Sequence, residues 1–167
     1  MYASKYGTTK QYAAWIAEEL GAELLQANTV SPARLREFDC VVYGGSLYAG
    51  GILGVKLIAK NPCKKLVVFT VGLADPQNTD YTRILKKNFP PGGTQPLKVF
   101  HLRGGIDYKN LSIVHRGMMA MVKKMSIGKR PYEELSDEER AFTDTYGGKV
   151  DFTGRLSIGP LVEYVAT

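Results

Sequence analysis

The chain of 167 residues and 18.4 kDa has the length of one ordinary domain. Its 44% hydrophobic and 23% charged residues are globular values, which excludes disordered and fibrous classes. The net charge is +6, with the basic excess in residues 56–130 and an acidic segment at 131–151. This distribution suits an anionic partner, or two segments that neutralise each other. No helix-turn-helix, zinc-finger or RNA-binding pattern indicates nucleic acid.

Targeting and metal signals are missing from the sequence. No stretch approaches the roughly 18 consecutive apolar residues of a membrane span. The first ten residues lack the basic and apolar regions of a secretory signal. Cys40 and Cys63 form neither a disulfide framework nor a zinc cluster, so we expect no metal site. These features predict a cytoplasmic protein.

The first half of the chain alternates between helix and strand patterns. Apolar residues at three- and four-residue spacing predict a helix over residues 8–20, which Gly21 ends. Four further elements are expected here: strands at residues 22–27 and 40–45, and helices at residues 32–38 and 51–60. Gly54 weakens the last of these helices.

The second half continues this alternation. Apolar runs and helical spacing predict strands at residues 66–71 and 97–102, and helices at residues 80–89 and 157–165. Short apolar strands that alternate with helices predict a parallel α/β sheet with helices on both faces. Ligands of such sheets bind at the carboxyl ends of the strands, so the loops after the strands are the candidate site.

The loop before the first helix is rich in hydroxyl groups. It comprises Ser4, Lys5, Tyr6, Gly7, Thr8 and Thr9. Hydroxyls, a glycine and the free N–H groups of a helix start suit a phosphate, although Ser and Thr are also common helix caps. The segment is neither the GxGxxG dinucleotide fingerprint nor a Walker loop, and it lacks a nucleophilic cysteine.

This helix start, with its Ser/Thr-x-x-Gly-x-Thr pattern and the glycine-rich turns after the third and fourth strands, resembles flavodoxins. More closely, the chain is similar to the flavodoxin-domain family that includes the menaquinone-dependent protoporphyrinogen oxidases. They share an ASxxGTT-like start, a VVxGGSxYxG-like third strand and loop, and an insertion after the fifth strand, here GGIDYKNLSIVHRGMMAMVKKM. The resemblance implies a flavodoxin-like three-layer sandwich over residues 1–167, with a five-stranded parallel sheet of order 2-1-3-4-5, helices on both faces, and FMN as cofactor.

The resemblance also assigns two loops to the flavin ring. Glycines allow close approach of the backbone, and an aromatic side chain offers a stacking face. After the third strand these residues are Gly45, Ser46, Leu47, Tyr48, Ala49 and Gly50, and after the fourth they are Thr70, Val71, Gly72 and Leu73. One departure concerns the first strand, because only three residues precede Ser4 where flavodoxins have five or six; we expect a truncated strand.

Other activities of this topology are not supported. A response-regulator receiver needs an acidic residue at the end of the third strand, where Gly44 and Gly45 stand. No G-x-S-x-G elbow indicates a hydrolase. His101 is expected in a strand and His115 on a helix surface, so we name no catalytic acid or base, and the flavin supplies the redox chemistry.

The insertion, expected at residues 104–130, is basic and rich in methionine. Asn110 is expected to cap its helix, whose apolar residues are Leu111, Val114, Met118, Met121, Val122 and Met125. Such a stripe is typical of core packing, which we favour, and also of a docking surface for an anionic membrane or a large apolar ligand. An acidic helix with a Ser136–Glu139 capping box is expected to follow.

Two functions fit the resemblance. The first is an FMN-dependent oxidoreductase that passes electrons from an anionic small-molecule substrate, such as a porphyrinogen, to a quinone, with peripheral contact at the inner membrane face. The second is a flavodoxin-type carrier that serves redox partner proteins, although typical carriers are acidic and this chain has a pI near 9.3. A flavin-free binding module is a third interpretation, because the first strand is short.

Overall fold

A computed structural model describes residues 1–48, 50–135 and 137–167 and divides the chain into two compact units. One unit comprises Met1–Gly104 with Thr153–Thr167, and the other comprises Gly105–Phe152. The first unit holds the parallel sheet, and the second corresponds to an insertion after its last strand. None of the helices in the described part of the chain is long and apolar enough to cross a bilayer.

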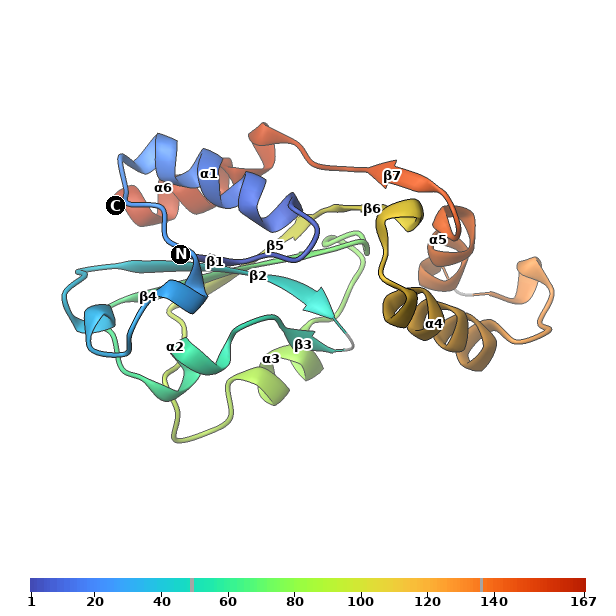
Figure 1. Cartoon of the computed structure of the whole chain (residues 1–167), viewed down its shortest axis with the longest axis horizontal. Helices are drawn as coiled ribbons and strands as arrows, with labels where there is room; N and C mark the ends of the chain where they lie inside the picture. The colour runs from blue at the N-terminus through green and yellow to red at the C-terminus, as the bar shows by residue number, and fades with distance from the viewer. Residues whose placement is uncertain (49, 136) are drawn as a thin grey trace. The chain divides into compact units, whose positions relative to one another are not determined.

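The first unit is built on a mostly parallel sheet, in agreement with the expected α/β class (Figure 1). Its parallel strands, in spatial order, are β1 (Tyr2–Ala3), β2 (Val41–Tyr48), β4 (Leu66–Gly72) and β5 (Lys98–Arg103). A two-residue strand, β3 (Gly51–Ile52), pairs antiparallel with the end of β2. Gln26 forms a single parallel bridge with Tyr2 on the outer side of β1. With that bridge as a minimal edge strand, the expected order 2-1-3-4-5 is present.

Helices cover both faces of this sheet (Figure 1). On one face lie α1 (Thr8–Leu20) and α6 (Gly159–Ala166), and on the other lie α2 (Lys56–Lys60) and α3 (Thr82–Asn88). Two buried apolar clusters result, one centred on Tyr12, Ile16 and Phe69, the other on Tyr43 and Ile58. Because β4 is covered on both sides, residues 66–71 are all buried, as its continuous apolar sequence predicts.

Three expected elements of the first unit are wrong or shortened. The strand over residues 22–27 is reduced to the bridge at Gln26. The helix over residues 32–38 is a single 3₁₀ turn, Arg34–Arg36. Residues 51–60 form a helix only from Lys56, because Gly50 and Gly54, both at φ 71°, place the antiparallel strand β3 between two turns. The helix over residues 8–20 is confirmed, and Gly21 ends it with φ 58°.

The second unit contains a short antiparallel pair and two helices. Its elements are β6 (Gly105–Asp107), α4 (Ile113–Val122), a π-helical turn (Lys123–Ile127), α5 (Asp137–Thr145) and β7 (Lys149–Asp151). The unit is longer than the predicted insertion of residues 104–130 because β7 returns to pair with β6. Asn110 does not cap α4; Ser112 does, accepting a hydrogen bond from the N–H of His115. Ser136 of the expected capping box lies outside the described residues.

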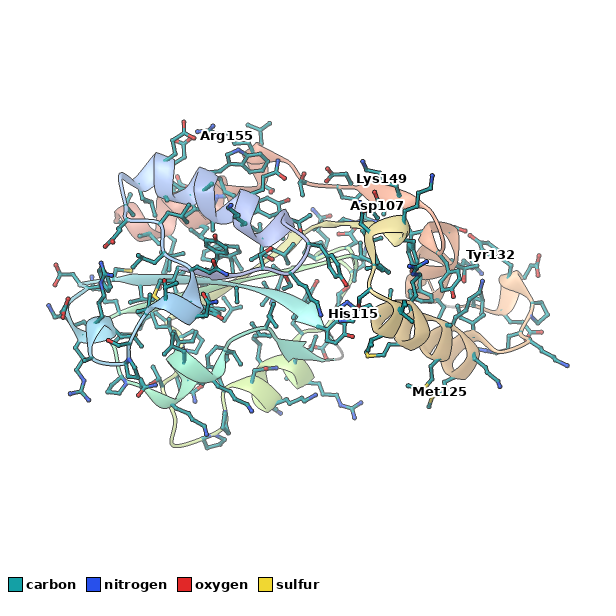
Figure 2. The ribbon with its side chains drawn as sticks, in the orientation of Figure 1. Asp107, His115, Met125, Tyr132, Lys149 and Arg155 are labelled. Carbon is teal, nitrogen blue, oxygen red and sulfur yellow. The ribbon has the colours of Figure 1, made fainter. Side chains whose placement is uncertain are left out.

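The apolar stripe of the insertion is divided between interior and surface. Leu111 is buried, whereas Val114 and Met121 are 71% and 55% exposed and Met125, labelled in Figure 2, is 78% exposed. The interpretation of the whole stripe as core is therefore wrong. His115, expected on the surface, is buried.

Candidate functional site

The carboxyl ends of the parallel strands place the predicted loops at one edge of the sheet. β1 leads into residues 4–7, β2 into the turn before β3, and β4 into residues 73–76. β1 and β4 both pair with β2, so the three loops start from neighbouring strands. An edge of this kind is where α/β sheets bind ligands.

The start of α1 offers free backbone donors. Gly7, with φ 98°, precedes the helix, and no side chain in the described part of the chain caps it. The first intrahelical bond runs from the N–H of Gln11 to the carbonyl of Gly7, so the three preceding helix amides have no acceptor within α1. Ser4 Oγ instead accepts the N–H of Gly7 at 3.1 Å. The hydroxyls therefore do not act as helix caps, and the uncapped N-terminus suits an anion.

A buried hydrogen bond joins this loop to β2. Thr9 is fully buried, and its Oγ1 lies 2.7 Å from Ser46 Oγ. Both residues were predicted as cofactor ligands, and the structure brings them into direct contact. Their bond fixes the start of α1 relative to the end of β2, which gives the edge a defined shape.

Tyr6, in the loop before α1, and Tyr48, at the end of β2, lie close to each other. Tyr6 and Tyr48 are each about two-fifths exposed. Partial desolvation, and then the nearby Tyr6, raise the pKa of the Tyr48 phenol. Two exposed aromatic rings at the carboxyl edge suit the stacking of a planar ligand.

The predicted glycine loop after the third strand is mostly strand. Gly45, Ser46, Leu47 and Tyr48 all belong to β2, Ala49 lies outside the described residues, and Gly50 turns the chain toward β3. A Cβ at Gly45 would lie 2.4 Å from Ile52 Cγ2, so the glycine is required for close packing of this turn. The strand extends further than expected because it continues into the β2–β3 pair.

Asn88 holds this turn, and sequence reasoning missed it. Its Nδ2 donates to the carbonyl of Gly50 at 3.1 Å, and its Oδ1 accepts the N–H of Ile52 at 2.9 Å. The residue stands at the end of α3, far from the turn in sequence. No sequence pattern marks an asparagine that satisfies the backbone of a distant turn.

The residues predicted after the fourth strand turn largely inward. Thr70 and Val71 are buried, and Thr70 Oγ1 lies 2.6 Å from Nδ1 of His101. The ring of His101 stacks on Tyr81 at 3.5 Å, and burial lowers the pKa of this histidine to about 4. This group of Thr70, His101 and Tyr81 stiffens the pairing of β4 with β5, as expected of a strand histidine.

The backbone at the end of β4 is held from β5. The carbonyl of Gly72 accepts the N–H of Gly104 at 2.7 Å, and the carbonyl of Leu73 accepts Arg103 Nε at 3.0 Å. A Cβ at Gly72 would lie 3.1 Å from Leu47 Cδ1, so the ends of β2 and β4 are closely packed. The carbonyls of Gly72 and Leu73 are therefore already engaged within the fold.

The donor set of this edge fits FMN. Free helix amides and hydroxyls suit a phosphate, and the tyrosine pair suits a flat ring. Within residues 1–48, 50–135 and 137–167, no group of three or more His, Cys, Asp or Glu side chains is placed to hold a metal ion.

Comparisons with known proteins find one family. The family model described as "Flavodoxin domain" matches residues 1–133. A flavodoxin from the domain Archaea is similar at 17% identity, with 62% of this chain and 81% of that chain covered and a TM-score of 0.40. Flavodoxin 1 from Bacillus cereus is similar at 19% identity, with 61% and 80% covered and a TM-score of 0.42. A comparison with curated protein sequences gives no match.

Proposed function

Because the chain belongs to the flavodoxin domain family, whose cofactor is FMN, we propose that it is an FMN-dependent oxidoreductase with a quinone as electron acceptor. The flavin ring accepts and releases electrons singly or in pairs, and the protein supplies binding and orientation. The observation that carries the proposal is the uncapped start of α1, fixed to the end of β2 by Thr9 and Ser46.

Each part of the edge has a separate task in this proposal. The free amides at the start of α1, with the hydroxyl of Ser4, bind the phosphate. Tyr6 and Tyr48 contact the faces of the ring and limit water around it. The turn at Gly50, held by Asn88, sets the distance between β2 and the ring. No side chain is assigned as a proton donor or acceptor.

The insertion supports an enzyme that meets a quinone or an anionic substrate, as protoporphyrinogen oxidase-like proteins do. Val114, Met121 and Met125 are exposed, and Arg116 and Lys124 on the same segment are exposed as well. Exposed apolar and basic side chains together suit the surface of an anionic membrane, where quinones reside. Lys123 lies over the ring of Tyr146 at 4.2 Å, so it is engaged within the insertion.

An electron carrier that serves redox proteins is the second candidate. The exposure of Tyr6 and Tyr48 favours it, because a partner protein could approach the ring edge directly. The pI near 9.3 favours an acidic partner surface. The two candidates share FMN and differ in the acceptor.

Flavin-fluorescence titration tests the cofactor site. Ser4→Ala with Thr9→Ala should weaken FMN at least about tenfold. The loss of Ser4 removes a hydrogen bond to a charged group, worth roughly 1.5–3 kcal/mol, and the loss of Thr9 removes the bond to Ser46 that positions the start of α1. Thr9→Ser should keep most of the affinity, since it retains the hydroxyl that contacts Ser46. Thr29→Ala with Ser31→Ala, an equal loss of hydroxyls elsewhere, is the control. Equal FMN affinity of the two double variants would refute this placement of the phosphate.

Quinone reduction and vesicle co-sedimentation separate enzyme from carrier. The FMN-loaded protein should reduce a soluble quinone and bind anionic vesicles at low salt. Arg116→Gln with Lys124→Gln should weaken vesicle binding, because each basic residue near an anionic surface contributes about 1 kcal/mol. Arg83→Gln with Lys86→Gln, the same charge change on α3, is the control. Neither quinone reduction nor sedimentation by the wild-type protein would favour the carrier.

A further inference from the structure

The strand β5 has a side, called here its outer side, that faces away from β4. Within residues 1–48, 50–135 and 137–167 no further strand pairs with β5 there. Natural sheets usually protect such a side with a short strand, a proline or a charge in the middle of the strand. β5 is six residues long, and residues 99–102 between Lys98 and Arg103 are uncharged and contain no proline. The middle of β5 therefore lacks these protections.

Hydrogen bonds at the strand ends show which backbone groups of β5 point outward. The N–H of Val41 donates to the carbonyl of Lys65 at 2.9 Å, and the N–H of Gly104 donates to the carbonyl of Gly72 at 2.7 Å. With the registers of the three strands, odd-numbered residues of β4 bond to β2 and even-numbered residues bond to β5. Even-numbered residues of β5 therefore face β4, and odd-numbered residues face outward.

The outward groups remain open in the middle of the strand. At its carboxyl end, the carbonyl of Arg103 accepts the hydroxyl of Tyr12 at 2.7 Å. Val99 and His101 are the other two odd-numbered residues of β5, and in the described part of the chain no backbone group bonds to their outward N–H and C=O. They offer two donors and two acceptors in a row, as strand addition requires.

A hollow of about 380 Å³ lies beside this backbone, between α3 and β5. Leu85 and Phe89 of α3 line it from one side, and Val99 and His101 line it from the other. In an antiparallel pair, residues directly opposite each other place their side chains on the same face. A strand paired with Val99 and His101 therefore places two of its own side chains over the hollow, which favours apolar residues at these two positions.

The surroundings of the hollow are basic. Residues 81–106 carry five Lys and Arg side chains and neither Asp nor Glu. Lys86 follows Leu85 on α3, and Lys98 begins β5; both lysines are exposed. Strand alternation places Lys98 on the face opposite to the hollow. This charge attracts an acidic segment and disfavours a second copy of β5, because a second copy brings the same lysines with it.

We propose that the outer side of β5 binds an extended acidic segment of a partner protein by antiparallel strand addition. The segment exchanges backbone hydrogen bonds with Val99 and His101 and lays two apolar side chains over the hollow. Its acidic side chains, at the alternate positions, lie on the face of Lys98. The surface is separate from the proposed flavin contacts, so this inference does not depend on the proposed function.

A blocked peptide of sequence Glu-Val-Glu-Val-Glu is the probe. Its two valines lie opposite Val99 and His101 in the proposed register. One form carries N-methyl groups on both valines, which removes the two donors that face β5. The matched control carries N-methyl groups on the central and last glutamates, whose N–H groups point away from β5. A third form has Lys in place of each Glu. Peptide titration and hydrogen exchange at Val99 and His101 measure binding.

The unmethylated peptide at saturation should slow exchange at both amides at least about threefold. Methylation of the valines should abolish this protection, and methylation of the glutamates should retain it. The lysine form should bind at least about tenfold more weakly. Equal binding of the two methylated peptides would overturn strand addition, and equal binding of the Glu and Lys forms would overturn the acidic partner.

Two further measurements use the protein itself. Lys86→Gln with Lys98→Gln should weaken binding of the unmethylated peptide about threefold or more, because two charge attractions are lost. Lys56→Gln with Lys60→Gln, the same charge change on α2, is the control and should bind like the wild-type protein. Equal binding of the two double variants, or a peptide-free dimer in which both β5 amides are protected, would overturn the proposal.

Discussion

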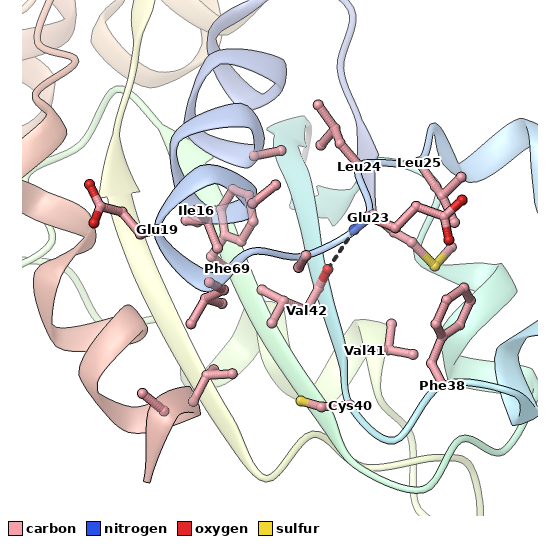
Figure 3. A pocket seen from close by; sticks show the side chains of 17 residues that line it. Ile16, Glu19, Glu23, Leu24, Leu25, Phe38, Cys40, Val41, Val42 and Phe69 are labelled. Atoms are coloured by element: carbon pink, nitrogen blue, oxygen red, sulfur yellow. Dashed lines mark hydrogen bonds between the residues drawn. The ribbon is translucent and has the colours of Figure 1, made fainter.

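The two edges of the parallel sheet differ in how the ends of the strands are packed. At the carboxyl edge, side chains from distant segments satisfy the turns, as Asn88 does for Gly50 and Ile52. At the amino edge, α1, the segment before Gln26, the start of β2 and α6 line an apolar cavity of about 410 Å³ (Figure 3). The first edge has its shape fixed by the residues already there, as a ligand site requires. The second keeps an apolar hollow between the sheet and its helices.

The largest expected effect comes from the strand that reaches both edges. Gly44 lies in β2, and a Cβ there would lie 2.0 Å from Cζ of the buried Phe69. Gly44→Ala should lower the free energy of unfolding by about 3 kcal/mol, because overpacking a rigid core forces shifts on its neighbours. Gly154→Ala, which meets no atom within 4 Å, is the control in the same denaturant titration. Equal stability of the two variants would show that β2 and Phe69 can shift enough to accommodate the added methyl group.

A smaller loss is expected when the carboxyl edge alone is loosened. Asn88→Ala removes hydrogen bonds to Gly50, Ile52 and Ile84, and should lower the free energy of unfolding by about 2 kcal/mol. It should also weaken FMN, because the β2–β3 turn loses its support. Asn61→Ala removes a single bond to the carbonyl of Leu57 and should leave FMN affinity unchanged. Similar FMN affinities for both variants would mean that the turn does not shape the site.

These residues show which parts of the molecule the sequence predicts. The helix over residues 8–20 and the strand beginning at Leu66 were predictable, because apolar spacing and run length record burial directly. The position of the hydroxyl-rich loop directly before α1 was predictable as well, because it depends on consecutive residues, whereas its role in binding a phosphate stays a prediction. Asn88 was not, because its partners lie in another segment, and the exposed side of α4 was not, because spacing alone does not say whether a stripe is covered.

The pH dependence of stability tests the β4–β5 pairing below the carboxyl edge. Burial lowers the pKa of His101 to about 4 from 6.5, so the unfolded chain binds a proton more readily than the folded one. The contribution of His101 to the free energy of unfolding is fully present above pH 6.5 and is lost as the pH falls toward 4. Because the ring is only half-buried, we expect a loss of about 1 kcal/mol between pH 7 and 5.

His101→Gln removes the titrating group. The free energy of unfolding of this variant should therefore fall less between pH 7 and 5 than that of the wild-type protein. Urea titrations of both proteins at pH 7, 6 and 5 measure the difference. Parallel pH profiles for the two proteins would show that His101 is not held neutral by its contacts with Thr70 and Tyr81.

The smallest effect is expected at the rim of the amino edge. Glu23 lines the cavity, and its Oε1 lies 2.7 Å from a guanidinium nitrogen of Arg34, with both side chains two-fifths exposed or more. An exposed ion pair is screened by water and salt, so Glu23→Gln should change the free energy of unfolding by less than about 0.5 kcal/mol. FMN affinity should not change, because the flavin contacts lie at the other end of the strands. A more than twofold change in FMN affinity would show that the two edges are coupled through strands such as β1 and β2, which run between them.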